Sequence, residues 1–385
     1  MKILFLAGWY PNKEDPTEGI FVKEHLNAVS LFNEVAVIYG REVKKQKKPL
    51  EFRSVTEDGV PAIRFTYRRP WYKTESFSTY VKGVLSGLQK LRDGGFRPDL
   101  IHANIYFTGV PASIIKKREG VPYVITEHFT KVSRKRLDRV NTGRLRLAMK
   151  NAYRILPVCK PLEKAIRDYG ITGYFEIVPN TVNDKIFYPP VEAIRNTDDI
   201  IKMLIVAGLR TMKNYPFLFS VLAYLKQKRG DVFQLQIVGD GPRREEFRKM
   251  VRRLNLENTV RFLGMRTKKE IADLMRGSDF FVLPSIWENL PCVLIESLAC
   301  GLPAVASDVS GIPEIINREN GILAKTDRVE EFTGALEYML DHHHDYSRKK
   351  IATEARKRYG YETVGRRLTG IYERVLAKKR SDRIV

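Results

Sequence analysis

The chain contains 385 residues, of which 43% are hydrophobic and 10% aromatic, enough to form the cores of two or three domains. No apolar run reaches the roughly 18 residues that a membrane-spanning helix needs, and the three cysteines have neither metal-binding nor redox spacing. The formal net charge of +22 indicates either a solvated charged surface or attraction to a polyanion; because no nucleic-acid-binding module is recognisable, we do not expect nucleic acid as a partner.

Strand-like and helix-like segments alternate through the first 182 residues, which predicts a mostly parallel sheet covered on both faces. The expected strands are Lys2–Ala7, Glu34–Tyr39, Leu100–Ala103, Tyr123–Thr126, Arg154–Val158 and Glu176–Pro179. The expected helices are Ile20–Ser30, Thr79–Leu91, Gly109–Lys117 and Pro161–Tyr169. The stretch Arg41–Tyr67 is interpreted as a hairpin-rich insertion. The opening apolar run is too short for a signal peptide, so we interpret it as the first strand.

Residues 183–199 contain prolines and lack periodicity, so we expect a linker there. A second series of strands is expected at Lys202–Ala207, Gln234–Val238, Val260–Phe262, Phe280–Leu283 and Ala304–Ala306. The helices between them are expected to start near Tyr215, Pro242, Lys268, Pro291 and Arg328. Residues 200–360 would then form a second α/β domain, and residues 361–385 a tail dominated by a long amphipathic helix.

The most informative motif is the stretch Ser285–Glu314, which places two carboxylates, Glu288 and Glu296, eight positions apart. Pro291 suits the first position of a helix, and Gly301 is expected to end that helix. Glu288 is therefore predicted in a loop at the carboxyl end of a strand, and Glu296 in the helix that follows. Open α/β sheets bind their ligands at this place.

This stretch resembles the signature of the retaining GT-B glycosyltransferases of family 4, in which two glutamates are separated by seven residues. The resemblance includes the Leu-Pro turn, the run Ala-Cys-Gly-Leu-Pro and the sequence Gly-Ile-Pro-Glu that ends at Glu314. It extends over the whole chain and is specific from Gly208 onward. It implies an α/β protein of GT-B architecture, with two Rossmann-like βαβ domains facing a central cleft and a C-terminal helix that crosses back to the first domain.

The resemblance also assigns donor-binding roles around the two glutamates. In the family the first glutamate lies beside the donor sugar and phosphates, and the second binds the ribose, since a carboxylate can accept from paired hydroxyls. Glu288 is therefore a candidate for catalysis and donor binding, and Glu296 for donor binding. Asn289 and Leu290, which follow Glu288, are included among the donor-binding candidates.

Two further loops of the second domain carry candidates. Arg210 and Lys213 follow Gly208 in the loop after the first strand, where the family stabilises the departing nucleotide diphosphate; a guanidinium fork and an ammonium suit that charge. Gly208 is predicted to contact the donor. Met265 and Arg266 follow another strand, at the position where the family binds the nucleotide base largely through backbone groups. The turn Gly239–Pro242 lacks the third glycine of a dinucleotide fingerprint and is interpreted as structural.

In the first domain, Gly19 opens a helix and would let backbone amides approach the donor phosphate. His128 follows a strand at the position of the family's active-site histidine, which contacts the sugar. Glu127 beside it either faces the acceptor or caps the loop, and His102, at the end of another strand, is a second candidate for the acceptor pocket. No cofactor is expected besides the nucleotide-sugar donor.

Metal-independent catalysis is also expected, because no Asp-x-Asp pair occurs in the sequence. The histidines of Asp341–Asp345 are adjacent, and adjacent side chains on a helix point in different directions.

The predicted function is transfer of a hexose-type sugar, with retention, from a nucleotide diphosphate to a hydroxyl of a lipid-linked or polysaccharide acceptor in cell-envelope glycan synthesis. Same-face attack and a covalent intermediate both remain open. Lys131–Lys150 contains eight basic residues and one acid, which favours docking on an anionic membrane surface and a cytoplasmic, peripheral location. The alternatives are a GT-B-fold nucleotide-sugar epimerase or phosphorylase, and a non-catalytic anion- or membrane-binding protein on the same scaffold.

Overall fold

A computed structural model describes residues 1–68, 73–191 and 200–381 of the chain. They form two compact units, one made of residues 1–180 together with the segment that begins at Tyr361, and the other of residues 181–360. Residues 183–191 of the predicted linker thus belong to the second unit, and residues 192–199 lie outside the described residues. No helix within the described ranges is long and apolar enough to cross a bilayer.

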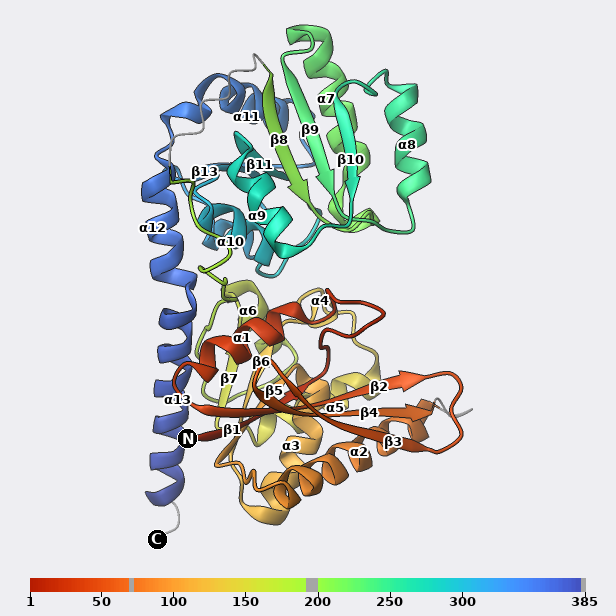
Figure 1. Ribbon diagram of the computed structural model, residues 1–385, viewed down its shortest axis with the longest axis vertical. Coiled ribbons are helices and arrows are strands. Elements are labelled where there is room, and N and C mark those ends of the chain that lie inside the picture. Colours follow the sequence, from red (N-terminus) through yellow and green to blue (C-terminus); the bar gives the residue numbers. More distant parts are fainter. Residues whose placement is uncertain (69–72, 192–199, 382–385) are drawn as a thin grey trace. The chain divides into compact units, whose positions relative to one another are not determined.

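The first unit is built on a sheet with strand order β3-β4-β2-β1-β5-β6-β7, in which only the β3–β4 pair is antiparallel (Figure 1). Its strands are β1 (Lys2–Ala7), β2 (Glu34–Val43), β3 (Leu50–Glu57), β4 (Val60–Arg68), β5 (Leu100–Asn104), β6 (Tyr123–Glu127) and β7 (Arg154–Pro157). Residues 3–7 of β1 are completely buried, as expected for a central parallel strand covered on both faces. The predicted insertion is the β3–β4 hairpin.

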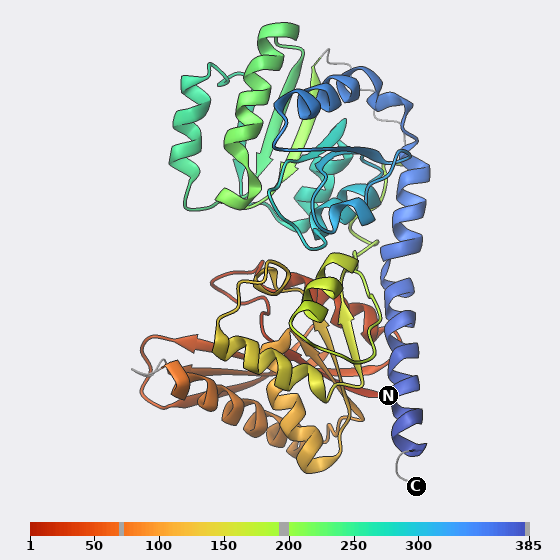
Figure 2. The same cartoon turned by 180° about the vertical axis from the view of Figure 1, so that it is seen from behind.

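Helices cover both faces of this first sheet (Figures 1 and 2). One face packs against α1 (Ile20–Ser30) and α13 (Tyr361–Ser381). The other face carries α2 (Lys73–Asp93), α3 (Tyr106–Glu119) and α5 (Arg139–Lys150). The short helix α4 (Thr130–Ser133) and α6 (Lys160–Asp168) complete the unit.

The C-terminal helix α13 is part of the core of the first unit. Its buried residues Leu368, Ile371 and Tyr372 pack in one cluster with α1 and the sheet. Gly365 permits the close approach of α13 to α1, because a Cβ atom at this position would lie 2.2 Å from the carbonyl oxygen of Ala28. The helix therefore stabilises a domain that lies far from it in the sequence.

The second unit contains a parallel sheet with strand order β10-β9-β8-β11-β12-β13. Its strands are β8 (Ile201–Val206), β9 (Phe233–Val238), β10 (Val260–Gly264), β11 (Phe280–Leu283), β12 (Ala304–Ser307) and β13 (Gly321–Ala324). One face of the sheet shares its apolar core with α7 (Tyr215–Arg229), α8 (Arg244–Arg253) and α11 (Val329–His342). The unit also contains α9 (Lys268–Arg276), α10 (Cys292–Ala299) and α12 (Arg348–Tyr359).

Several predicted elements differ from the structure, and α2, for example, begins at Lys73 rather than at Thr79. Glu176–Pro179 is not a strand: its amides at Glu176 and Val178 donate to carbonyls of Ile155 and Pro157 in β7, but Pro157 and Pro179 have no N–H with which to continue a ladder. Helix α10 begins at Cys292, with Pro291 extended before it, and α8 begins at Arg244 rather than near Pro242. Helices α5 and α12 and strand β13 were not predicted.

The two glycines of α13 test the packing of this helix against α1. We expect Gly365→Ala to destabilise the first unit by about 1–3 kcal/mol, since the methyl group would overlap the Ala28 carbonyl. Gly370→Ala is the matched control: the added Cβ would meet only the Arg374 guanidinium, at 3.6 Å, so better helix propensity should raise stability by up to about 1 kcal/mol. Urea unfolding measures both. Equal effects of the two substitutions would contradict the proposed contact.

Candidate active site

The strand order of the second sheet reverses between β8 and β11. Strands β9 and β10 follow β8 outward on one side, while β12 and β13 follow β11 outward on the other. The loops after β8 and β11 therefore leave the carboxyl ends of two adjacent strands in opposite directions, which is the geometry that forms a ligand crevice in open α/β sheets. Arg210 and Lys213 lie in the first of these loops, and Glu288 lies in the second.

Lys213 and Glu288 meet at this point. The Lys213 Nζ lies 2.5 Å from Glu288 Oε1, and the side chains are 24% and 15% exposed. Ser285 Oγ donates to the same carboxylate oxygen at 2.8 Å. The main chain also joins the two loops, because the Ile286 amide donates to the Met212 carbonyl at 2.9 Å. The structure thus brings together two of the residues that the sequence nominated for catalysis.

The loop after β11 is also held in place by contacts with the interior of the second unit. Ser285 is completely buried, and its carbonyl accepts from Ser307 Oγ at 2.7 Å. Asn289 and Leu290, which continue the loop, are 7% and 5% exposed. The Glu288 carboxylate is therefore held by a loop with little freedom, a condition for precise placement of a ligand.

Glycines position the loop after β8. A Cβ atom at Gly239 would lie 2.2 Å from the Ala207 carbonyl oxygen, and one at Gly241 would lie 2.6 Å from the Leu209 carbonyl oxygen. The turn after β9 therefore packs directly on the backbone around Gly208, which agrees with its structural interpretation. Arg210 projects from this loop with an exposed side chain.

The remaining donor-binding candidates are spread over the same unit. Glu296 is half-buried on α10, whose Leu294 and Leu298 are buried in the domain. Met265 and Arg266 are exposed in the loop after β10, an edge strand separated from β8 by β9. The structure thus places these two residues two strands away from Lys213.

In the first unit, Gly19 lies at the start of α1 in a left-handed conformation with φ of 60°. A Cβ atom there would lie 2.3 Å from the backbone of Trp9, so glycine is required for this turn. The first turn of α1 carries no acidic side chain. Its amino end therefore keeps the positive partial charge that attracts phosphate.

His128 lies next to the beginning of α1. Its ring centroid is 4.5 Å from that of Phe21 and 5.6 Å from that of His25, and its side chain hydrogen-bonds with Asn180. Burial, with His25 and His102 as further causes, holds the pKa of His128 well below its usual value. The imidazole is therefore neutral near pH 7 and suited to hydrogen bonding rather than to carrying charge.

Glu127 caps the loop that follows β6 and is not exposed to solvent. It is completely buried and accepts hydrogen bonds from the amides of Tyr106, His128 and Phe129, at 2.9, 2.9 and 2.8 Å. Burial raises its pKa to about 7, against the opposite effect of these hydrogen bonds. Of the two roles left open by the sequence, the structure supports the cap.

His102 is a core residue, so its assignment to the acceptor pocket is wrong. It is completely buried, and its ring nitrogens lie 2.6 Å from the Tyr372 hydroxyl and 2.6 Å from Thr126 Oγ1. Both nitrogens are therefore occupied by partners from α13 and β6. The sequence around His102 offered no sign of this, because Tyr372 is 270 residues away.

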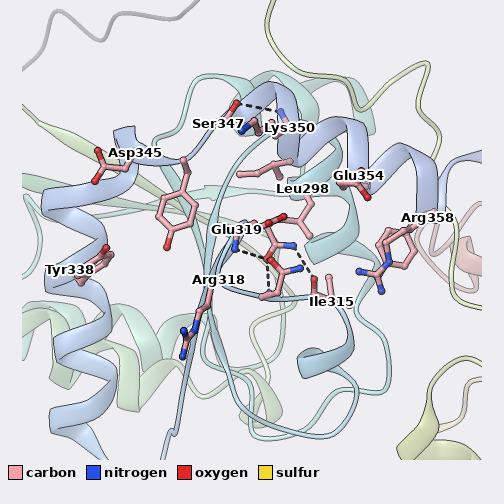
Figure 3. A pocket seen from close by; sticks show the side chains of 16 residues that line it. Leu298, Ile315, Arg318, Glu319, Tyr338, Asp345, Ser347, Lys350, Glu354 and Arg358 are labelled. Atoms are coloured by element: carbon pink, nitrogen blue, oxygen red, sulfur yellow. Dashed lines mark hydrogen bonds between the residues drawn. The ribbon is translucent and has the colours of Figure 1, made fainter.

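A separate cavity of about 410 Å³ lies in the second unit beside α12 and the end of α11 (Figure 3). It is lined by residues that include Tyr338, Asp345, Lys350, Glu354 and Arg358, and by none of the candidate site residues. Asp345 belongs to the histidine-rich Asp341–Asp345 segment. Within residues 1–68, 73–191 and 200–381, no cluster of His, Cys, Asp or Glu forms a candidate metal site.

Comparison with known proteins identifies the family. The model "Glycosyl transferases group 1" matches residues 188–358, and the model "Glycosyltransferase Family 4" matches residues 33–185. These matches cover most of the chain, which belongs to the group 1 glycosyltransferases of family 4. The predicted class of enzyme, a glycosyltransferase, is thereby confirmed.

One curated relative is the UDP-Gal:alpha-D-GlcNAc-diphosphoundecaprenol alpha-1,3-galactosyltransferase of Escherichia coli. It is 25% identical over 268 residues, which span 63% of this chain and 66% of that protein. Two curated relatives from Bacillus subtilis differ in how much of their length is aligned. The alignment spans 30% of the putative glycosyltransferase EpsF and 88% of the putative teichuronic acid biosynthesis glycosyltransferase TuaC.

Solved structures confirm the predicted GT-B class of fold with two Rossmann-like domains. Sucrose-phosphate synthase from Thermosynechococcus elongatus has a TM-score of 0.78 at 20% identity, covering 98% of this chain and 99% of that one. Anabaena HepE, solved in complex with UDP and glucose, has a TM-score of 0.74 at 19% identity, covering 97% and 99%. At these identities the similarity establishes the fold alone.

Buried neutral histidines should make the first unit sensitive to acid. His25 is completely buried, and burial lowers its pKa to about 4. Unfolded His25 takes up a proton near pH 6.5, but folded His25 does so only near pH 4. The free energy of unfolding should therefore fall as pH drops through this window, by up to about 1.4 kcal/mol per pH unit.

Urea unfolding at about pH 7.5 and about pH 5 checks this expectation, with His25→Gln as the comparison. The variant should lose less stability between the two pH values than the wild type. The raised pKa of Glu127 acts in the opposite direction, but it is present in both proteins and cancels in the difference. Equal losses in both proteins would show that His25 does not titrate in this window.

Proposed function

We propose that the protein is a retaining, metal-independent glycosyltransferase that moves a hexose-type sugar from a nucleotide diphosphate to a hydroxyl of a glycan acceptor. The observation that carries this proposal is the Lys213–Glu288 pair at the reversal point of the second sheet, with Arg210 in the same loop as Lys213. A departing nucleotide diphosphate carries at least two negative charges, which one ammonium and one guanidinium can stabilise without a metal ion.

The two glutamates divide the binding of the donor. Glu288, held beside Lys213 by Ser285, orients the donor sugar and keeps the ammonium directed at the phosphates. Glu296 on α10 binds the ribose hydroxyls, which a carboxylate accepts as a pair. The loop backbone at Gly208, Asn289 and Leu290 lines the donor site, and the backbone at Met265 and Arg266 contacts the base.

In the first unit, Gly19 and His128 are the proposed groups for binding a phosphate and a sugar hydroxyl. The amino end of α1 offers backbone amides to phosphate. The neutral His128 imidazole hydrogen-bonds a sugar hydroxyl. Same-face attack by the acceptor, with its proton passing to the leaving phosphate, requires no enzymic nucleophile. Proton NMR of the anomeric centre in the product tests retention directly.

The acceptor is proposed to be a lipid-linked or polysaccharide glycan of the cell envelope. The Escherichia coli relative is named for transfer to GlcNAc-diphosphoundecaprenol, which supports a lipid-linked acceptor. The main alternatives are a nucleotide-sugar epimerase or phosphorylase of the same fold and a non-catalytic binding protein. Incubation with UDP-, GDP- and ADP-sugars separates them: a transferase releases nucleotide diphosphate when an acceptor is present, an epimerase forms an epimer, a phosphorylase forms a sugar phosphate only with inorganic phosphate, and a binding protein does none of these.

Helix α5 has the exposed surface expected for docking on an anionic membrane. Val140 and Leu147 are 57% and 48% exposed and, being seven residues apart, lie on one face of the helix. Arg139, Arg146 and Lys150 are exposed beside them. Apolar side chains in the acyl boundary together with basic ones at the headgroups form a peripheral membrane contact, which would place the enzyme on the cytoplasmic face of the membrane.

Substitutions in the second unit should separate the proposed roles. Lys213→Ala should lower kcat/KM for the nucleotide sugar by about 10²–10³-fold, because charge stabilisation of the leaving group is lost. Glu296→Ala should mainly raise KM for the donor, and Glu288→Ala should mainly lower kcat. Lys249→Ala, at an exposed site on α8, is the control and should leave both parameters unchanged. Unchanged turnover in Lys213→Ala would refute the assignment.

Charge reversal on α5 should weaken membrane binding. We expect Arg139→Glu/Arg146→Glu to reduce co-sedimentation with phosphatidylglycerol-containing vesicles by at least roughly 30-fold, since each basic residue contributes about 1 kcal/mol near an anionic surface. The control Arg252→Glu/Arg253→Glu has the same charge change on α8 and should bind as the wild type does. Binding that is insensitive to salt and to phosphatidylglycerol content would argue against this docking mode.

A further inference from the structure

The hairpin β3–β4 and strand β2 lie at one edge of the sheet in the first unit (Figure 1). Across these strands Tyr39 pairs with Arg64 and Arg64 with Arg53, so the three side chains share one face. The opposite face carries Phe65, whose ring packs against Gly83 of α2. The face with Phe65 is therefore covered by α2. The face with Tyr39 lies on the side of the sheet that packs against α1 and α13, but Arg53 on β3 remains exposed there.

A cavity of about 780 Å³ lies over the face with Tyr39, entirely within the first unit. We call it the hairpin groove. Its floor is the face just described, and its wall is the Tyr10–Pro16 part of the loop between β1 and α1. The volume falls within the range of about 300–1,000 Å³ typical of small-molecule sites.

The wall of the groove is fixed by Arg64. This guanidinium forms a bidentate pair with Glu57, at 2.6 and 2.8 Å, and donates to the Pro11 carbonyl at 2.8 Å. It also lies 5.4 and 5.7 Å from the ring centroids of Tyr10 and Tyr39. A partly buried cation with this many partners fixes the loop before any ligand arrives.

A second set of contacts anchors the same loop. Glu18 accepts hydrogen bonds from Tyr39 OH at 3.0 Å and Asn12 Nδ2 at 2.6 Å. Arg41 pairs with Glu14 at 2.6 Å. The groove is therefore preorganised, and its wall leads directly to Gly19 at the start of α1.

The groove also presents exposed groups of both charges. Glu51 and Arg53 are exposed on β3 and, being two residues apart, point to the same face. Lys13 is exposed on the facing wall. A hydroxyl group can donate to a carboxylate and accept from a guanidinium or ammonium, so a polyhydroxylated ligand matches this alternation.

We propose that the hairpin groove binds a saccharide unit of the acceptor glycan, with Glu51 and Arg53 hydrogen-bonding its hydroxyls. This inference rests on the proposed function and gives the β3–β4 insertion a role in acceptor specificity. The charge pattern of the floor favours a saccharide over a second protein chain, because charged groups of both signs lie on a preformed surface beside the rings of Tyr10 and Tyr39. A second copy of this chain is the competing occupant that the experiment must exclude.

Saturation-transfer NMR on the full chain tests the groove, with the methyl glycosides of N-acetylglucosamine, galactose, glucose and glucuronic acid as probes. At least one glycoside should receive saturation from the wild type. Arg53→Trp, which fills the groove from an exposed position, should weaken that binding roughly tenfold or more, because a charged hydrogen bond is replaced by a steric block. Lys82→Trp, exposed on α2, is the control and should bind like the wild type.

The possible outcomes are separable. No saturation of any probe, or equal saturation in Arg53→Trp, overturns the groove as a saccharide site. A dimer in sedimentation velocity that Arg53→Trp dissociates would show instead that the groove is an interface between copies. Calorimetry with UDP-, GDP- and ADP-sugars is run on the same proteins: unaltered donor binding in Arg53→Trp leaves the proposed function standing, whereas absent donor binding in the wild type refutes that function independently of the groove.

Discussion

The reversal of strand order between β8 and β11 is the constraint on which the second unit depends. Successive crossovers turn away from each other at that point, so no connecting helix covers the carboxyl ends of these two strands. Two loops lie at the carboxyl ends of these strands, and a backbone hydrogen bond from Ile286 to Met212 joins them. Lys213 and Glu288 meet because main-chain geometry holds their loops together, and the side chains then add the charge.

Much of the second unit could be predicted because its signals are local. Strand β11, helix α10 and the helix end before Gly301 follow from a few adjacent residues, so Glu288 was correctly expected in a loop and Glu296 on a helix. Lys213 was nominated by the family motif. Its pairing with Glu288 joins two segments that are 75 residues apart, and no local pattern specifies that contact.

The first unit shows where local reasoning fails. His102 lies within the buried strand β5 and His128 directly follows the buried strand β6, and the sequence gives the two residues the same appearance. They differ in their contacts with distant segments. The Tyr372 hydroxyl of α13 hydrogen-bonds with the ring of His102, whereas the rings of Phe21 and His25 of α1 pack against His128. The role of Glu127 likewise depends on the Tyr106 amide at the start of α3. Contacts between distant segments decide which of these polar groups is structural.

The place of α13 in the first unit has a consequence for synthesis of the protein. Residues 181–360 are contiguous, so the second unit has its whole core once they have left the ribosome. The first unit lacks Leu368, Ile371 and Tyr372 until the segment after residue 360 has been synthesised, and the part of its sheet that these residues cover stays exposed until then. The core of the first unit is thus completed after that of the second, and its exposed apolar surface is open to aggregation during that interval.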